Sequence, residues 1–392
     1  MSQLLPLEVF TDRLPAMLAD LAELVGCETP SADLAAVAAG AELVARQGAR
    51  ALGAEPEVLV REGCTHLRWR LGGGPRRVLL LCHSDTVWPL GTLAEIPWSV
   101  TDGVARGPGC FDMKAGVVLA FTVLAQLRAA GADLDGVTVL VTGDEEIGSP
   151  TSADLIRAEA RGCAAVLVLE ASADGGALKT GRKGASMYDL VVTGRAAHAG
   201  LEPEQGVNAT VELAGQVLAI AALADPARGT SVTPTALTAG TTTNTVPAAG
   251  RLSVDVRALT AAEQQRVDAG MRALTPQLPG AVLELRGGIN RPPLEESSSA
   301  GLFALAGAVS ARLGLPAPVA VTVGGASDGN FTAGIGVPTL DGLGAVGGGA
   351  HAAGEHVVAG ELPARAALLA GLVTQLLTGG GVGGPDEEPD GE

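Results

Sequence analysis

Hydrophobic residues form two kinds of pattern along the chain. Apolar runs without polar alternation, at 77–82 (RVLLLC), 137–142 and 165–169 (AVLVL), predict central β-strands that are covered on both faces. Longer segments with helical spacing alternate with these strands and predict two helices within 7–53, one near 113–130 and one at 151–161. Further strands are expected near 55–60 and 65–72. This alternation predicts an α/β domain with a layered, mostly parallel sheet.

The pattern changes near residue 184 and changes back near residue 290. Within 184–289 the predicted order is strand, helix, strand, strand, helix, strand, the β-α-β-β-α-β order of a ferredoxin-like domain. The earlier pattern then resumes, with helices near 299–313 and 361–377 and short strands near 318–323 and 337–340. We therefore expect one discontinuous domain, residues 1–183 and 290–378, and an inserted domain, residues 184–289.

Composition and charge narrow the possible partners. A net charge of −17 argues against nucleic acids and anionic membrane surfaces. No apolar run reaches the length of a membrane span, and the N-terminus lacks the basic start of a signal peptide. The five cysteines are scattered and form no CxxC pair, which favours a reduced, cytoplasmic protein. Residues 379–392 are rich in Pro, Gly and acids and are expected to form a disordered tail.

Three consecutive acids, Asp144, Glu145 and Glu146, directly follow the predicted strand 137–142. Neighbouring carboxylates repel each other and are partly desolvated at a strand end, so a compensating cation is expected. Other histidines and acids follow predicted strands or lie in Gly-rich loops: His83, Asp85, Asp112, Glu170 and His351, with Glu355 four residues on. Open α/β sheets bind ligands at the carboxyl edge, and mixed His/carboxylate ligation suits Zn²⁺. The pattern predicts two metal ions that share one carboxylate, with one glutamate of the cluster free to act as a base.

Each of these residues also has a purely structural interpretation. Either histidine alone is most simply a polar loop residue, Asp112 an N-cap, Glu170 a surface carboxylate and the acidic cluster a solvated loop. Coincidence at every strand end is improbable, which favours the metal site. The run GLGAVG at 342–347 fits GxGxxG, but poor helix material follows it, so we expect crowded backbone beside His351 rather than a nucleotide site.

The motifs HSDTV, GPGCFDMKAG, GDEEIGS, LEAS, GRAAHAG, NTVP, DVR and HAAGE occur in this order across nearly the whole chain. Together they resemble the di-zinc M20 metallopeptidases, which include glutamate carboxypeptidase, acetylornithine deacetylase, succinyl-diaminopimelate desuccinylase and aminoacylase. The resemblance implies one zinc at His83, Asp112 and Glu170 and another at Asp112, Glu146 and His351. It also implies Glu145 as general base, Asp85 as the residue that orients His83, and a cis peptide at Asp112–Met113.

The resemblance further implies that the insert is a lid through which two subunits dimerise. His198 would reach the partner subunit's active site and polarise the scissile carbonyl, Asn244 would be a second carbonyl or carboxylate contact, and Arg257 would pair with a substrate carboxylate. The phrases HAGLEPEQGVNA and NRPPLE most resemble the glutamate carboxypeptidase subgroup, for which Lys179 and Arg291 would be extra basic contacts.

The activity implied is hydrolysis of an amide bond to an amino acid in a small peptide or N-acyl-amino acid. A carboxypeptidase that releases a C-terminal, glutamate-like residue is the first interpretation. An N-acyl-amino-acid deacylase or a dipeptidase of the same family is the alternative. A non-catalytic dimeric binding module is an alternative of another class, and missing metal ligands would favour it.

Overall fold

The computed structural model describes residues 4–379, which divide into two compact units. The larger unit has three segments, which run up to Gly181, over Glu296–Thr322 and from Ser327 onward. The smaller unit comprises Arg182–Glu295 and Val323–Ala326. The insert expected at 184–289 falls within the first of these two segments. The predicted acidic tail, apart from Gly379, lies outside the described residues.

A six-stranded sheet forms the middle of the larger unit. Its order is β1 (Glu57–Arg61), β2 (Cys64–Arg70), β6 (Val137–Thr142), β3 (Val78–His83), β7 (Ala165–Val168) and β14 (Thr339–Leu340). The last four pair in parallel, whereas β1 and β2 add an antiparallel edge that the sequence analysis did not specify. Every residue of β3, β6 and β7 is buried, as their unbroken apolar runs predict. The expected α/β fold with a largely parallel sheet is confirmed.

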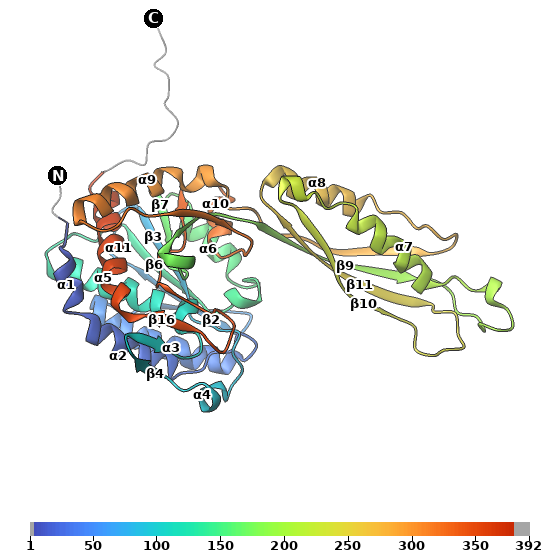
Figure 1. Ribbon diagram of the computed structural model, residues 1–392, viewed down its shortest axis with the longest axis horizontal. Coiled ribbons are helices and arrows are strands. Elements are labelled where there is room, and N and C mark those ends of the chain that lie inside the picture. The colour runs from blue at the N-terminus through green and yellow to red at the C-terminus, as the bar shows by residue number, and fades with distance from the viewer. Residues whose placement is uncertain (1–3, 380–392) are drawn as a thin grey trace, which may run out of the picture. The chain divides into compact units, whose positions relative to one another are not determined.

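Helices cover both faces of this sheet (Figure 1). On one face the core includes residues of α1 (Leu7–Thr11), α2 (Leu14–Val25), α3 (Leu34–Leu52), α5 (Ala115–Ala129), α9 (Glu296–Leu313) and α11 (Leu362–Leu377). On the other face Leu79, Leu81 and Leu140 share a cluster with residues of α6 (Ala153–Ala160) and α10 (Gly329–Ala333). Among the described residues, Cys110–Ala129 is long and apolar enough to cross a membrane, but 78% of its apolar window is buried, as expected for a core helix.

Several short elements complete the larger unit. A four-stranded sheet has the order β15 (Gly347–Gly348), β16 (His356–Val358), β5 (Val104–Arg106) and β4 (Ser99–Thr101), and β8 (Leu178–Arg182) pairs with β13 (Ala320–Val323). One turn of helix, α4 (Thr92–Glu95), precedes β4. The sequence analysis missed most of these elements, because strands of two to five residues are too short to show a period.

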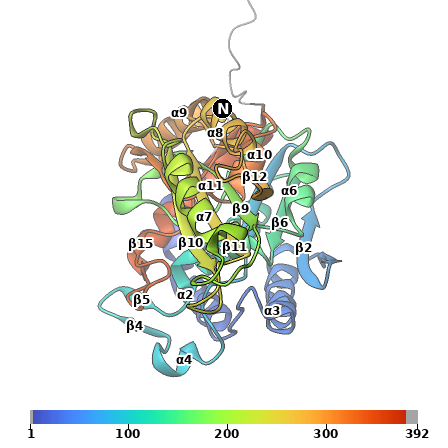
Figure 2. The same cartoon turned by 90° about the vertical axis from the view of Figure 1, so that its right-hand side faces the viewer.

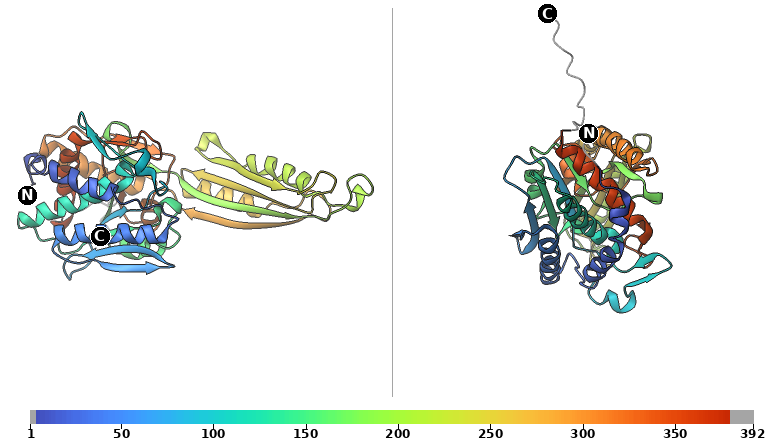
Figure 3. Two further views of the ribbon diagram at one scale, coloured as in Figure 1. Left: turned by 90° about the horizontal axis from the view of Figure 1, so that it is seen from below. Right: turned by 90° about the vertical axis from the view of Figure 1, so that its left-hand side faces the viewer.

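The smaller unit is an antiparallel sheet with two helices on one face (Figure 3). Along the chain come β9 (Gly184–Thr193), α7 (Ala209–Ala221), β10 (Ser231–Ala239), β11 (Ala249–Ala258), α8 (Ala261–Arg272) and β12 (Val282–Arg291), and the sheet order is β10-β11-β9-β12. Helix α7 packs on β10 and β11, as Figure 2 also shows, and α8 packs on β11 and β12. This element order is the predicted one. Buried Tyr188, Leu190 and Val192 of β9 alternate with more exposed residues, which leaves the second face of the sheet open.

Candidate active site

Five predicted metal ligands lie together at the carboxyl edge of the large sheet. His83 ends β3, Glu146 follows β6 in a short 3₁₀ turn at Glu145–Ile147, and Glu170 lies two residues beyond β7. Asp112 lies at a kink with non-helical backbone within Cys110–Lys114, the segment that leads into α5. His351 lies in the loop between β15 and β16. The parallel strands therefore bring together residues that are far apart in the sequence.

Asp112 lies between two groups of ligand atoms. Its Oδ1 is 3.3 Å from Nε2 of His83, and its Oδ2 is 3.4 Å from Nε2 of His351. Oε1 of Glu170 lies 3.4 Å from the same nitrogen of His83, and Oε2 of Glu146 lies 3.1 Å from that of His351. In each group the three ligand atoms lie within 4.8 Å of one another, so one carboxylate has an oxygen in both.

These donors fit a metal ion better than they fit one another. Nε2 of His83 and Oε1 of Glu146 are buried, and neither has a hydrogen-bond partner among the described residues. A buried polar atom without a partner costs roughly 1–3 kcal/mol, which ligation would offset. Each group combines one imidazole with two carboxylates, the set of three protein ligands that leaves a position open on a divalent metal.

The local charge also favours a cation. Burial acts to lower the pKa of His83, but the carboxylates of Asp112, Asp85 and Glu170 outweigh it and raise that pKa well above its usual value. Asp112 and Glu146 raise the pKa of His351 to about 10. The carboxylates thus create a negative potential that stabilises positive charge at this place.

Asp85 holds both His83 and the turn that carries the two glutamates. The backbone carbonyl of Asp85 accepts a hydrogen bond from Nδ1 of His83 at 3.0 Å, while Oδ1 of its carboxylate is 3.5 Å from the same nitrogen. Nε2 of His83 is therefore the ring nitrogen that is left to face Asp112 and Glu170. The Asp85 carboxylate accepts from the backbone N–H groups of Glu145 and Glu146, at 3.1 Å each, and from the Ser31 hydroxyl at 2.6 Å. The sequence analysis expected Asp85 to orient His83, and the backbone carbonyl of Asp85, rather than its carboxylate, makes the shorter contact.

Glu355, which the sequence analysis named only as an acid near His351, holds the loop that carries Asp112. Its Oε2 accepts from the indole N–H of Trp88 at 2.7 Å and the N–H of Gly109 at 2.9 Å. Its Oε1 accepts from the N–H groups of Phe111, at 2.9 Å, and Asp112, at 3.1 Å. Burial raises the pKa of Glu355, yet all four neighbours are donors, so the pocket is built for a carboxylate. In the sequence Glu355 stands out only by its place in the motif HAAGE, which does not reveal these four donors.

Backbone geometry around these residues also agrees with two expectations. The peptide bond Asp112–Met113 is cis, as the resemblance implies. The glycine run 342–347 opens no helix, and a Cβ on Gly344 would lie 2.3 Å from the carbonyl oxygen of Leu169. The close backbone approach was expected beside His351 and is made here beside Glu170, and the run lacks the helix that a nucleotide fingerprint opens.

His198 and Asn244 are neighbours in the smaller unit. The carbonyl of Asn244 accepts from the N–H of Ala199 at 2.9 Å, and His198 forms a β-bridge with Thr245. The His198 side chain is exposed, and its Nδ1 accepts from the N–H groups of Gly200 and Leu201. Its Nε2 must then carry the ring proton, which makes the exposed imidazole a hydrogen-bond donor.

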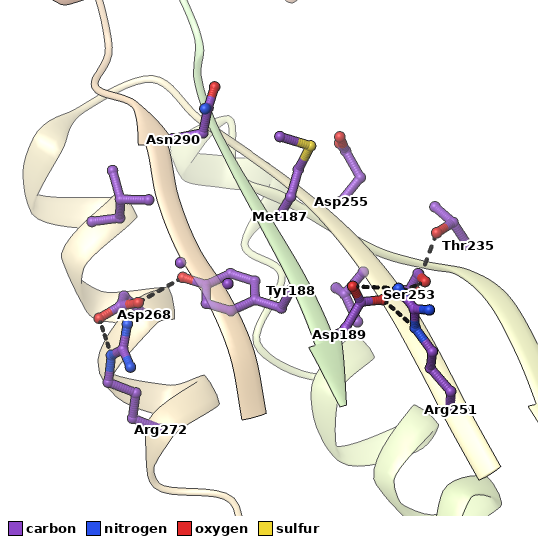
Figure 4. A pocket seen from close by; sticks show the side chains of 14 residues that line it. Met187, Tyr188, Asp189, Thr235, Arg251, Ser253, Asp255, Asp268, Arg272 and Asn290 are labelled. Atoms are coloured by element: carbon purple, nitrogen blue, oxygen red, sulfur yellow. Dashed lines mark hydrogen bonds and ion pairs between the residues drawn. The ribbon is translucent and has the colours of Figure 1, made fainter. Parts of the chain in front are cut away.

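Arg257 lies on the open face of the same unit and is paired with Asp255. Nε of Arg257 is 2.9 Å from Oδ1, and Nη2 is 2.9 Å from Oδ2. Asp255 also lines a pocket of about 1050 Å³, where Arg251 forms an ion pair with Asp189 (Figure 4). The planar guanidinium fork is thus already arranged for a carboxylate.

The two remaining predicted residues are placed differently. Arg291 is the last residue of β12 and is buried. Lys179 lies on β8 in the larger unit, and its N–H donates to the carbonyl of Asp341 at 3.0 Å. Neither residue belongs to the two groups of metal ligands.

Comparison with known proteins assigns this arrangement to a family. Residues 79–375 match Peptidase family M20/M25/M40. Carboxypeptidase G2 of Pseudomonas sp. (strain RS-16) is 32% identical over 382 residues, 94% of this chain and 91% of that protein. Succinyl-diaminopimelate desuccinylase of Dechloromonas aromatica (strain RCB) is 27% identical over 354 residues, 83% of this chain and 90% of that protein. The crystal structure of aminopeptidase PepT from Bacillus cereus has the same fold, with a TM-score of 0.71 at 20% identity over 93% of this chain and 98% of that one.

The fold and its metal-ligand groups, together with these relatives, define the protein as a metallohydrolase. The chain belongs to the peptidase family M20/M25/M40.

Proposed function

We propose that the protein is a two-zinc carboxypeptidase that releases a C-terminal, glutamate-like residue from a small peptide or N-acyl-amino acid. The observation that carries this proposal is the position of Asp112, whose two carboxylate oxygens lie in two separate groups of ligand atoms. The 32% identity to carboxypeptidase G2 supports the reaction class. Relatives named as desuccinylases support the alternative, an N-acyl-amino-acid deacylase of the same family.

The proposed metal ligands are His83, Asp112 and Glu170 for one zinc and Asp112, Glu146 and His351 for the other. Zinc ions held there would polarise a carbonyl as Lewis acids and lower the pKa of water from 15.7 to about 7.

Glu145 is the proposed general base, and its place in the chain suits that role. It adjoins the ligand Glu146, its side chain is buried, and Asp85 holds its backbone N–H. As general base it takes a proton from the attacking water and passes it to the leaving nitrogen, a role that contributes roughly 10²–10⁴-fold to the rate.

Residues of the smaller unit are proposed to bind the substrate. The Nε2–H of His198 donates to the carbonyl oxygen as negative charge develops on it. Arg257 pairs with the substrate carboxylate, and Asn244, beside His198, is a further polar contact. Lys179 of the larger unit and Arg291 of the smaller one are proposed as additional basic contacts for an acidic residue.

We also propose a cytoplasmic homodimer that forms through the smaller unit, with His198 acting in the partner's site. Helix α7 exposes an uncharged outer face, on which Val211 is 54% and Leu218 74% exposed. This face adjoins the edge strand β10, where Leu237 is 45% exposed. A second copy would cover both the apolar face and the unpaired strand edge. The five free cysteines support a reducing compartment.

A hydrolysis screen tests the activity. We expect the zinc-loaded protein to cleave N-acyl-glutamates and peptides with a C-terminal glutamate faster than matched neutral substrates. Glu145→Ala should lower kcat by roughly 10²–10⁴-fold at unchanged zinc content, while the exposed Glu95→Gln leaves both unchanged. Preference for short N-acyl groups irrespective of the amino acid would instead identify a deacylase. If the zinc-loaded protein turns over none of these substrates, the non-catalytic binding module is the function that remains.

Mixing two inactive variants tests the role of the partner. Glu145→Ala and His198→Ala should each be inactive alone. If His198 acts in the partner's site, each mixed dimer regains one complete site, so an equal mixture recovers roughly one quarter of the wild-type activity. If His198 acts within its own subunit, the mixture stays inactive.

A further inference from the structure

A third group of titratable side chains lies behind the turn that carries Glu145 and Glu146. Cys64 and His66 of β2 and Asp144 offer ligand atoms within 4.8 Å of one another, and all three residues are buried. By distance alone the group resembles a further metal site. Its hydrogen bonds show a different arrangement.

Both ring nitrogens of His66 are already engaged. Nδ1 accepts from the backbone N–H of Gly143 at 3.2 Å, so Nε2 carries the proton and donates to Oγ1 of Thr151 at 3.0 Å. The Thr151 hydroxyl in turn donates to Oδ2 of Asp144 at 2.7 Å. Burial lowers the pKa of His66 and raises the pKa of the Cys64 thiol to about 12, in keeping with a neutral ring and a protonated thiol.

The carboxylate of Asp144 is engaged to the same degree. Oδ2 also accepts from the N–H groups of Thr151 at 2.7 Å and Ser152 at 3.2 Å, and Oδ1 accepts from the Ser152 hydroxyl at 2.5 Å. Hydrogen-bond donors therefore already surround the Asp144 carboxylate. Nε2 of His83, by contrast, has no hydrogen-bond partner among the described residues. His66, Thr151, Asp144 and Ser152 thus form a hydrogen-bond network that joins β2 to both ends of the segment 143–152.

We propose that His66 is a positioning residue that fixes this segment, and with it Glu145 and Glu146, against the metal-ligand groups. Strand β2 lies directly against the segment, because a Cβ on Gly143 would be 2.6 Å from the carbonyl oxygen of Thr65. Asp85 holds the segment at the N–H groups of Glu145 and Glu146.

A third anchor holds the segment from another side. Asp328 accepts from the hydroxyl of Thr142 at 3.0 Å and from that of Ser149. His66 is the anchor at Gly143, and without its ring the N–H of Gly143 and the hydroxyl of Thr151 both lose a buried partner. The part of this proposal that concerns catalysis rests on the proposed function, since it takes Glu145 as the base.

Three variants of His66 separate its two contacts. The amide oxygen of Asn can replace Nδ1 as acceptor for Gly143, and the amide nitrogen of Gln can replace Nε2–H as donor to Thr151. We expect His66→Ala to lower kcat by about tenfold or more with KM within about twofold. The variant should also bind one of the two zinc ions with lower affinity, and the backbone amides of residues 143–149 should exchange their hydrogens faster. His66→Asn should restore most of each property, and His66→Gln less.

Cys64→Ala is the matched control on the same strand. We expect it to keep kcat within about twofold of wild type and the same zinc content. The proposal is overturned if His66→Ala, or His66→Gln should the alanine variant not fold, leaves kcat and exchange as in wild type. It is equally overturned if the wild type binds a third zinc that both His66→Ala and Cys64→Ala lose. If the wild type has no hydrolase activity, the proposed function fails, while exchange and zinc affinity still test the role of His66.

Discussion

Replacing Glu355 by Gln tests how the loop that carries Asp112 is held. The Glu355 carboxylate accepts four hydrogen bonds, from Trp88, Gly109, Phe111 and Asp112. A glutamine offers one acceptor oxygen and one NH₂ group, so two of the four donors meet another donor in either orientation of the amide.

The expected cost follows from those two donors. Each buried donor left without a partner costs roughly 1–3 kcal/mol, which gives about 2–6 kcal/mol for Glu355→Gln. That is a large part of the roughly 5–15 kcal/mol by which folded proteins are stable. Because Asp112 contributes one of the N–H groups, zinc should also bind more weakly.

Urea denaturation of the metal-free protein, followed by circular dichroism, measures this cost, and zinc titration measures the second effect. Glu95→Gln, an exposed change of the same type, is the control. A loss of less than about 1 kcal/mol for Glu355→Gln would show that these four contacts do not hold the loop, and the reasoning would fail.

Three further predictions follow from other parts of the structure. Asp112→Asn should lose both zinc ions by elemental analysis, whereas His351→Ala should lose one, since only Asp112 has an oxygen in both groups. Gly116→Ala should destabilise the protein by about 1–3 kcal/mol in thermal unfolding, because the new Cβ would lie 2.1 Å from the carbonyl oxygen of Leu169; Gly307→Ala in α9, with open space around it, should not. Arg266, Arg228 and Thr230 lower the pKa of Glu263 from 4.5 to about 2, so this carboxylate stabilises the fold above pH 4.5 and loses the effect as the pH falls toward 2. Urea denaturation should therefore find Glu263→Gln less stable than wild type at pH 7, with the difference shrinking as the pH falls toward 2.

The sequence predicted those features that depend on local pattern. The apolar runs gave β3, β6 and β7, and the six-element order gave the smaller unit. Strand order predicted that histidines and acids would meet at one edge of the sheet, and the resemblance implied how they divide into the two groups around Asp112. The roles of Glu145, His198 and Arg257 remain predictions.

What the sequence did not predict depends on contacts between distant segments. Strands β16 and β5 are short, and each is completed by a partner far away in the chain. Glu355, His66 and Asp328 each look like an ordinary polar residue until folding places donors around them. Single-residue chemistry cannot reveal such roles, since the partners are mostly backbone N–H groups and hydroxyls that any sequence contains.

The interruption of the larger unit by the smaller one has a consequence for synthesis on the ribosome. A nascent chain that ends at Gly181 already contains His83, Asp112, Glu146 and Glu170, but His351 and Glu355 emerge only after the whole insert has been made. Most of the smaller unit is one continuous segment, so it can fold before the larger unit is complete. The Asp112–Glu146–His351 group can form only after His351 has been synthesised. Neither fragment of a chain cut within the insert contains this complete group, so hydrolysis would report their reassembly.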